Sequence, residues 1–151
     1  MSTTGNTTVP PSGHHLLVEL RNDGIYFASF DPLEDDTYQS CSVSFTAKNR
    51  PLCENVKNCV YENPQLLQEY DRTYILVDTS HFTFVPEELE KEEENRLPYY
   101  DFCFSGHDDH VIENHLVLNH AYLLFGVEHE LYTFLCRTFS NPIILHPLAS
   151  L

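Results

Sequence analysis

The chain has 151 residues and carries 23 acidic against 8 basic residues, for a net charge of −15 at pH 7 with histidine neutral. This length suits one domain with a sizeable core, and a hydrophobic content of 42% argues against wholesale disorder. The shortage of Lys and Arg argues against binding to nucleic acid or to an acidic membrane surface, because both are recognised through clustered positive charge.

The N-terminal segment and the cysteines indicate the setting in which the chain folds. Residues 1–13 are polar and lack the charged and then apolar pattern of a signal peptide, so we expect a disordered leader there and a single domain over residues 14–151. No apolar run approaches the roughly 20 residues needed to cross a bilayer. The five cysteines include no C-x-x-C pair, which predicts free, mostly buried thiols in a reducing cytoplasm.

Residues 15–47 predict three antiparallel strands. Residues 15–31 contain two segments rich in apolar, β-branched and aromatic side chains, and the Asn-Asp-Gly sequence at 22–24 between them suits a hairpin turn. A third strand is expected over residues 39–47. There a period of two predicts one buried face, with serines alternating with Cys41, Val43 and Phe45.

The pattern becomes helical after the third strand. Pro51 is a suitable first helical residue, and helical spacing follows at Leu52, Val56, Cys59 and Val60. Asn-Pro at 63–64 interrupts the pattern, and residues 65–70 predict a second short helix. Residues 73–77 then predict a compact strand that is buried on both faces.

An acidic run follows the next extended segment, residues 82–85. Pro86 is expected to open a helix in which six of the eight residues 87–94 are Glu. Glutamates near a helix N-terminus and the pair of Glu87 with Lys91 favour that helix. We interpret the run as a solvated helix face rather than as an acidic docking patch.

The last third of the sequence predicts strands, a helix and a closing strand. Residues 99–127 are expected to be extended, with a hairpin around Asn119-His120. Residues 128–139 have the strongest helical pattern in the chain, and residues 143–145 form a final buried strand. The order of these elements predicts an α/β fold with a mixed β-sheet flanked by helices.

The C-terminal end is unusually apolar. Six of its last ten residues are apolar, whereas chain termini are commonly polar. We therefore expect the chain to be one half of a longer protein. An uncovered apolar surface near residues 142–145 and 148–151 would favour a homodimer whose association strengthens with salt.

Several short segments carry a family resemblance. Residues 82–89 have the sequence FTFVPEEL, which is similar to a T-x-V-P-E-x-L strand-to-helix signature. Ile112-Glu113-Asn114 is similar to a strand end of the form hydrophobic-x-Asn, and Ile143-Ile144-Leu145-His146 is similar to a closing strand followed by His. Together with the opening hairpin and the unit at 122–139, these segments resemble domain-of-unknown-function family 3822, a bacterial family with an actin-like ATPase fold.

The resemblance implies a fold and a nucleotide site. It implies the first half of an actin-like protein, a ribonuclease-H-like unit, with the nucleotide lying between two halves. In that superfamily a first hairpin turn of the form D-x-G-[ST] touches the phosphates. The candidate nucleotide-binding residues here are Asn22, Asp23 and Gly24. Asn22 replaces the expected Asp, and Ile25 replaces Ser or Thr. Asp-Gly is also a common way to close a hairpin, and we favour this plain turn.

Two other groups of residues contain side chains that could form a chemical site. Metal-type ligands are dense at residues 107–115, but zinc needs three or four convergent ligands, so we interpret residues 105–109 as a polar turn and expect no stoichiometric zinc. Cys103 has histidines that could pair with it in space, although a buried structural thiol is the default. The sequence contains no G-x-S-x-G, no G-x-x-x-x-G-K-[ST] and no G-x-G-x-x-G.

The sequence therefore favours a non-catalytic interaction or regulatory domain without a cofactor. Its expected partner is another protein or a second copy of the chain, and its expected location is the cytoplasm. The alternative is a nucleotide-binding ATPase half that takes ATP with Mg²⁺ and requires a missing C-terminal part. Metal-dependent chemistry at residues 107–115 is a third and more distant hypothesis.

Overall fold

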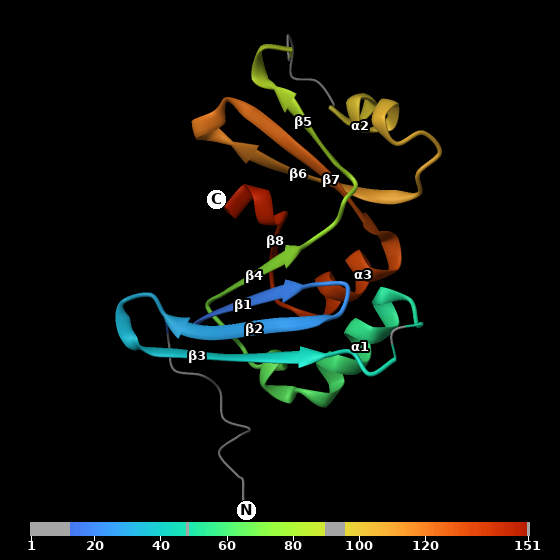
Figure 1. Ribbon diagram of the computed structural model, residues 1–151. Helices are drawn as coiled ribbons and strands as arrows, with labels where there is room; N and C mark the ends of the chain where they lie inside the picture. Colours follow the sequence, from blue (N-terminus) through green and yellow to red (C-terminus); the bar gives the residue numbers. More distant parts are fainter. Residues whose placement is uncertain (1–12, 48, 90–95, 151) are drawn as a thin grey trace, which may run out of the picture.

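Two β-sheets make up the framework of the protein (Figure 1). The computed structural model describes residues 13–47, 49–89 and 96–150. A five-stranded sheet has the order β3-β2-β1-β4-β8, and a three-stranded sheet has the order β5-β7-β6. The expected disordered leader at residues 1–13 lies almost wholly outside the described residues.

The five-stranded sheet contains the predicted hairpin at its centre. Strand β1 (His15–Leu20) pairs antiparallel with β2 (Gly24–Asp31), which pairs with the edge strand β3 (Glu34–Ser44). On the other side, β1 pairs in parallel with β4 (Arg72–Val77), and β4 pairs in parallel with β8 (Ile143–Leu145). The predicted mixed sheet is confirmed, although β3 begins five residues earlier than expected and ends three residues sooner.

Two helices pack on this sheet. Helix α1 (Leu52–Glu62) has Pro51 as the residue before it rather than as its first residue. Helix α3 (His129–Thr138) matches the strongest helical pattern of the sequence. The second short helix expected at residues 65–70 is wrong. The chain forms only a 3₁₀ turn, Pro64–Leu67, because Leu66 is fully buried there while Gln68 is already extended.

The smaller sheet comes from one excursion of the chain between β4 and α3. It contains β5 (Phe82–Pro86), β6 (Asp109–Leu116) and β7 (Ala121–Glu128), with helix α2 (Leu97–Cys103) on one face. The hairpin expected around Asn119-His120 is confirmed, and His120 adopts a positive φ of 52° in it. The expectation of extended chain from residue 99 is wrong, because a helix with Pro98 in its first turn starts at Leu97, and its Tyr100 packs inward and is fully buried.

The acidic run is only partly within the described residues. Glu87–Leu89 form one 3₁₀ turn, and the rest of the expected helix, including Lys91, lies outside them. Glu87 instead lies 2.5 Å from Nε2 of His115 and 3.6 Å from Nδ1 of His120. This hydrogen bond to His115 lowers the pKa of Glu87.

A shared core joins the two sheets. One hydrophobic cluster contains β1 and β4 side chains together with Leu123, Phe125 and Val127 of β7. Asn114 of β6 adds polar contacts, since it donates to the Ile144 carbonyl at 3.2 Å and accepts the His146 backbone N–H at 3.1 Å. The two sheets are therefore packed as one body.

The cysteines are free, but they are not mostly buried. Cys53 and Cys59 on α1 are buried, and burial raises the pKa of both thiols. Cys41, Cys103 and Cys136 are exposed, because they lie on an edge strand and at outward positions of two helices. None of the described helices has the length and apolarity needed to cross a membrane.

Candidate functional site

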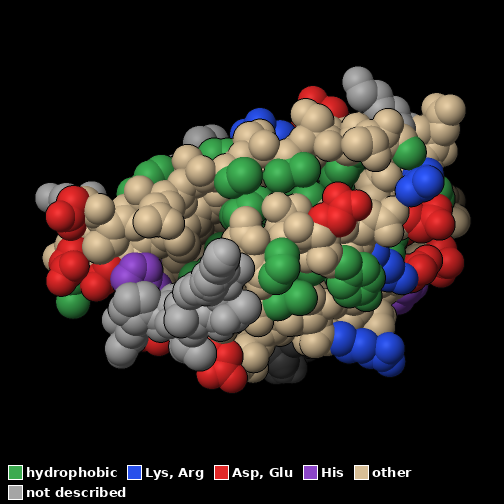
Figure 2. Space-filling view, turned by 90° about the horizontal axis from the view of Figure 1, so that it is seen from below, with side chains coloured by type: hydrophobic (Ala, Val, Ile, Leu, Met, Phe, Trp, Pro, Cys, Tyr) green, Lys and Arg blue, Asp and Glu red, His purple; other side chains and the backbone are tan. Residues whose placement is uncertain are grey.

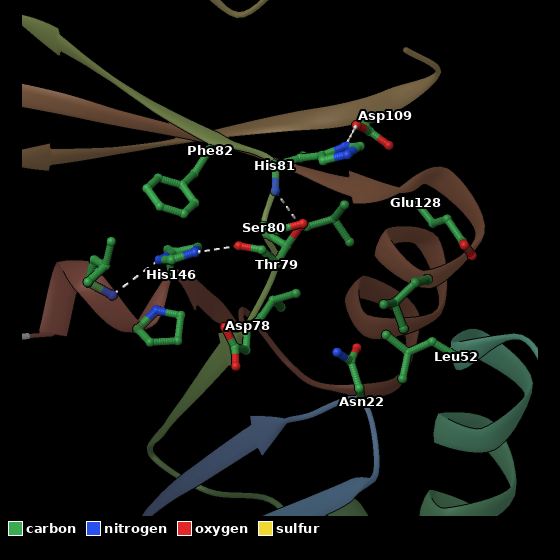
Figure 3. A pocket seen from close by; sticks show the side chains of 16 residues that line it. Asn22, Leu52, Asp78, Thr79, Ser80, His81, Phe82, Asp109, Glu128 and His146 are labelled. Atoms are coloured by element: carbon green, nitrogen blue, oxygen red, sulfur yellow. Dashed lines mark hydrogen bonds and ion pairs between the residues drawn. The ribbon is translucent and has the colours of Figure 1, made fainter. Parts of the chain in front are cut away.

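The main pocket lies where the parallel strands of the larger sheet end (Figure 3). It has a volume of about 640 Å³. Asn22 reaches it from the turn after β1, residues 78–81 from the segment after β4, and His146 from the residue after β8. The smaller sheet and the start of α3 close the opposite side. In open α/β sheets ligands bind outside the carboxyl ends of the strands, so this edge is the natural candidate site.

The pocket is negatively charged. Carboxylates of Asp78, Asp109 and Glu128 line it, and Figure 3 shows them on different sides of the space. None of the described lining residues is Lys or Arg. The basic side chain beside the turn, Arg21, is held by Glu19 at 2.6 Å and does not line the pocket. The electrostatic field of the pocket therefore attracts cations and repels phosphates.

Asp109 is the best-positioned of these carboxylates. Its Oδ2 accepts the Tyr100 hydroxyl at 2.9 Å and lies 3.4 Å from Nδ1 of His81. Its backbone N–H donates to Nδ1 of His107 at 3.1 Å. Burial, with the hydrogen bond to Asp109 second, raises the pKa of Tyr100, so this hydroxyl keeps its proton and donates it to the carboxylate. These contacts fix the Asp109 side chain at the edge of the pocket.

Gly126 of β7 makes this arrangement sterically possible. A Cβ at this position would lie 2.0 Å from the Tyr100 hydroxyl and 2.5 Å from Oδ2 of Asp109. Both distances are far below van der Waals contact, so no larger residue fits without displacing the pair. The backbone N–H of Gly126 also donates to the His81 carbonyl at 3.0 Å. Gly126 thus supports two residues of the pocket wall.

His146 is a structural histidine. Its side chain is 3% exposed and packs on Phe82 and Phe125, with ring centroids 4.7 and 5.6 Å away. Nδ1 accepts the backbone N–H of Leu148 at 3.2 Å, so Nε2 carries the proton and donates it to the Thr79 carbonyl at 2.8 Å. Both ring nitrogens are occupied, which leaves no lone pair for a metal or for general-base chemistry.

The candidate nucleotide turn reaches the pocket with only one of its residues. Asn22 lines the pocket, whereas the Asp23 carbonyl accepts the Phe45 backbone N–H at 2.9 Å. Gly24 is buried, and a Cβ there would lie 2.3 Å from the Val43 carbonyl oxygen. The close approach of β3 is therefore sufficient to explain the glycine, which faces a strand rather than a ligand.

The histidine-rich segment at residues 107–115 does not converge on one point. His107 lies 2.6 Å from Asp101, His110 stacks on Tyr132 at 3.6 Å, and His115 contacts Glu87. Over the described ranges, no three His, Cys, Asp or Glu side chains come close enough together to hold a metal ion. Cys103 is exposed rather than buried, and its thiol contacts the Thr83 hydroxyl at 3.6 Å.

Of the residues that line the pocket, the sequence analysis named Asn22 as a nucleotide-binding candidate and Asp109 only as part of a polar turn. The polar residues Asp78, Thr79 and Ser80 directly follow a buried strand, which is a usable signal for a site at a carboxyl edge. Asp109 and Glu128 carry no such signal, because they enter the pocket only through the packing of the smaller sheet.

The strand order and the carboxyl-edge pocket together define half of an actin-like ATPase fold. The chain belongs to the family described as "Protein of unknown function (DUF3822)", whose model matches residues 5–151. No curated protein matches the chain.

Two solved structures are similar to the chain. One is a Bacteroides thetaiotaomicron protein described as having an actin-like ATPase fold and unknown function, with 26% identity and a TM-score of 0.82 over 91% of this chain and 53% of that one. The other is the cytoplasmic domain of EpsL, an inner membrane component of the type II secretion system of Vibrio cholerae, with 15% identity and a TM-score of 0.52 over 87% of this chain and 57% of that one. The chain spans about half the length of both.

Proposed function

We propose that this chain is a non-catalytic interaction domain on an actin-like framework, whose carboxyl-edge pocket receives a basic segment of a partner protein. The observation that carries the proposal is the lining of the pocket, which has carboxylates on several sides and neither Lys nor Arg among its described residues. Carboxylates that are spread apart suit several positive charges along a peptide better than they suit one bound ion.

The chemistry of the pocket supports binding more than catalysis. A general base or a nucleophile needs a reactive atom free to meet its substrate. His146 uses both ring nitrogens in backbone hydrogen bonds, and Asp109 is held by the Tyr100 hydroxyl. Polar groups held in this way are better suited to recognising charge than to moving a proton.

The EpsL neighbour adds support from the fold. It is a component of a secretion system, so a protein with this fold takes part in a protein assembly. Fold likeness alone is a weak guide to function, and it serves here only to favour a protein partner. We infer that the chain acts in the cytoplasm, since the five free thiols are typical of a reducing compartment.

A second candidate function is nucleotide binding by a longer protein of which this is one half. The observation that favours it is the position of Asn22, which lines the pocket from the turn that corresponds to the phosphate turn of the actin-like superfamily. ATP with Mg²⁺ would be the cofactor, since the metal would offset the negative field. In this function the backbone N–H groups of the turn would have to contact the phosphates. Against it, Gly24 is buried and packs closely against the backbone of β3.

Thermal unfolding with three probes separates the two functions. We expect octalysine to raise the melting temperature at low salt, and millimolar ATP or ADP with Mg²⁺ to leave it unchanged. A ligand at 100 times its dissociation constant adds about 2.7 kcal/mol of stability. For a domain of this size that corresponds to a rise of roughly 5–10 °C. Octaglutamate serves as the peptide of opposite charge.

Matched variants test whether the pocket is the binding site. Glu128→Gln and Asp78→Asn each remove one charge from the pocket and should reduce the octalysine shift. Glu62→Gln removes the same charge from an exposed position on α1, away from the pocket, and should not. A reproducible Mg²⁺-dependent rise with ATP would overturn the non-catalytic proposal. Equal octalysine shifts in all three variants would remove the pocket as the binding site.

A further inference from the structure

We propose that two copies of this chain associate through β3, pairing their edge strands antiparallel so that the two five-stranded sheets become one continuous sheet. This inference does not depend on what the pocket binds, because β3 lies on the opposite side of β1 from β4. It also differs from association through the final strand. Strand β8 has three residues, whereas β3 has eleven.

The outer edge of β3 presents free backbone groups. The Phe45 N–H bonds the Asp23 carbonyl of the hairpin turn at 2.9 Å, and the register of β2 with β3 is regular from Gly24–Ser44 to Ser29–Gln39. Successive residues of an antiparallel strand alternate in the direction of their N–H and C=O groups. The groups of Ser40, Ser42 and Ser44 therefore point away from β2, and no described strand pairs with them.

Within the described residues, the middle of this edge carries no Lys, no proline and no bulge, which are features that commonly block strand pairing. Residues 37–44 have the sequence TYQSCSVS, without a charge, a proline or a glycine. Protein edge strands are usually protected by Lys, Pro, a bulge or a covering element. The irregularity in the β2–β3 pairing is confined to residues Ser29 and Asp31, at the far end of the hairpin from Ser44.

The surface around β3 agrees with this pattern. Figure 2 views the molecule from below, and β3 is the lowest strand of the sheet in Figure 1. Hydrophobic side chains lie across the middle of the face in Figure 2, and acidic side chains gather toward its left and right ends. Among the residues that the structure describes, the middle of this face is therefore more apolar than its two ends.

Charge distribution favours a second copy as that partner. Glu34 and Asp36 stand at the start of β3, and Arg50 follows its end. Antiparallel pairing about a two-fold axis brings the acidic start of each strand toward the segment that follows the end of the other strand, where Arg50 lies. The net charge of −15 per chain still opposes association, and salt screens that repulsion over a Debye length of about 8 Å at physiological strength.

We propose the register whose axis passes through Cys41, because its exposed thiol would then face the same thiol of the second copy. With Cys41 facing its own copy, Ser40 faces Ser42 of the second copy, and Tyr38 faces Ser44. Cys41 bonds toward β2, so across the new interface it forms a non-hydrogen-bonded pair, for which the Cα separation is about 4.5 Å. This separation lies within the range that a disulfide spans. The exposed Cys41 thiol is therefore a probe of the proposed register.

The first test measures mass by light scattering over a range of protein and salt concentrations. We expect the wild-type chain to approach twice the monomer mass, and Ser42→Lys to remain monomeric while it keeps the far-ultraviolet circular dichroism spectrum of the wild type. Thr133→Lys adds the same charge at an exposed position of α3 and should associate like the wild type. Because an added lysine reduces the net repulsion between copies, loss of association in Ser42→Lys cannot come from charge alone. A monomeric wild type, or dimeric Ser42→Lys, overturns the proposal.

The second test uses Cys41 in a background of Cys103→Ser and Cys136→Ser. Diamide accepts the two hydrogen atoms released when two thiols join, and it should give a dimer linked through Cys41 on each chain. Adding Ser42→Lys should reduce the yield at least tenfold. A yield equal in both proteins would mean that the link forms by random collision and that the strands do not pair. Neither test involves the pocket, so failure here leaves the proposed function standing.

Discussion

The substitution Gly126→Ala tests the packing that holds Asp109 at the pocket. The added Cβ would lie 2.0 Å from the Tyr100 hydroxyl, 2.5 Å from Oδ2 of Asp109 and 2.8 Å from its Cβ. Tyr100 has no exposed surface, so its ring cannot move outward to make room. We expect the hydroxyl to be driven away from Asp109.

Two effects determine how much folding stability Gly126→Ala should lose. Breaking a buried hydrogen bond to a charged group costs about 1.5–3 kcal/mol. Forcing an extra methyl group into a packed core costs about 1–3 kcal/mol more. The combined loss of about 2.5–6 kcal/mol corresponds to a melting temperature lower by roughly 5–24 °C in a domain of this size.

A double-mutant cycle with Tyr100→Phe identifies the cause. The Phe variant lacks the oxygen that the new Cβ would meet, so Gly126→Ala should cost clearly less in that background than in the wild type. The assay is denaturant unfolding followed by circular dichroism. Gly106→Ala is the control, because it has no neighbouring atom within 4 Å and only its positive φ of 77° disfavours alanine. Equal costs of Gly126→Ala in both backgrounds would refute the steric explanation.

Two further predictions concern contacts of β6. Burial, and then the charge of nearby His129, lowers the pKa of His110, so the unfolded chain binds a proton more readily and the native state should lose stability as the pH falls below about 6.5. His110→Phe keeps the stacking on Tyr132 and should flatten the dependence of melting temperature on pH between 7 and 5, whereas an unchanged slope would assign it to other groups. Asn114→Ala leaves the buried His146 N–H without its acceptor and should cost about 1–3 kcal/mol in urea unfolding. A loss below about 0.5 kcal/mol would show that Asn114 does not tie the sheets together.

Local patterns were sufficient for most of the larger sheet. The hairpin of β1 and β2 follows from two apolar segments around Asn-Asp-Gly, and α3 follows from a clear amphipathic period. Helix α2 was missed because its sequence, LPYYDFC, is rich in aromatic residues that favour strands, and only the burial of Tyr100 against Asp109 and Leu124 makes it helical.

The pocket was harder to predict than the fold. Asn22 was found because it lies in a recognisable turn after a strand. The wall that carries Asp109 and Glu128 depends on how the smaller sheet packs against the larger one, which no local pattern encodes. The buried position of Gly24 likewise depends on the course of β3, so the sequence could not distinguish a phosphate turn from a packing constraint.

The excursion that forms the smaller sheet starts and ends at neighbouring points. The hydrogen bond from Gly126 to His81 joins its incoming and outgoing strands side by side, so in topology residues 78–128 are an insertion that a short link could replace. The folding stability of residues 78–128 nevertheless depends on the larger sheet. Leu123, Phe125 and Val127 share one hydrophobic cluster with Leu16, Val18 and Ile75, and deleting the insertion would expose that cluster to water. A short link could therefore restore the course of the chain after such a deletion, but it could not restore the core that the two sheets share.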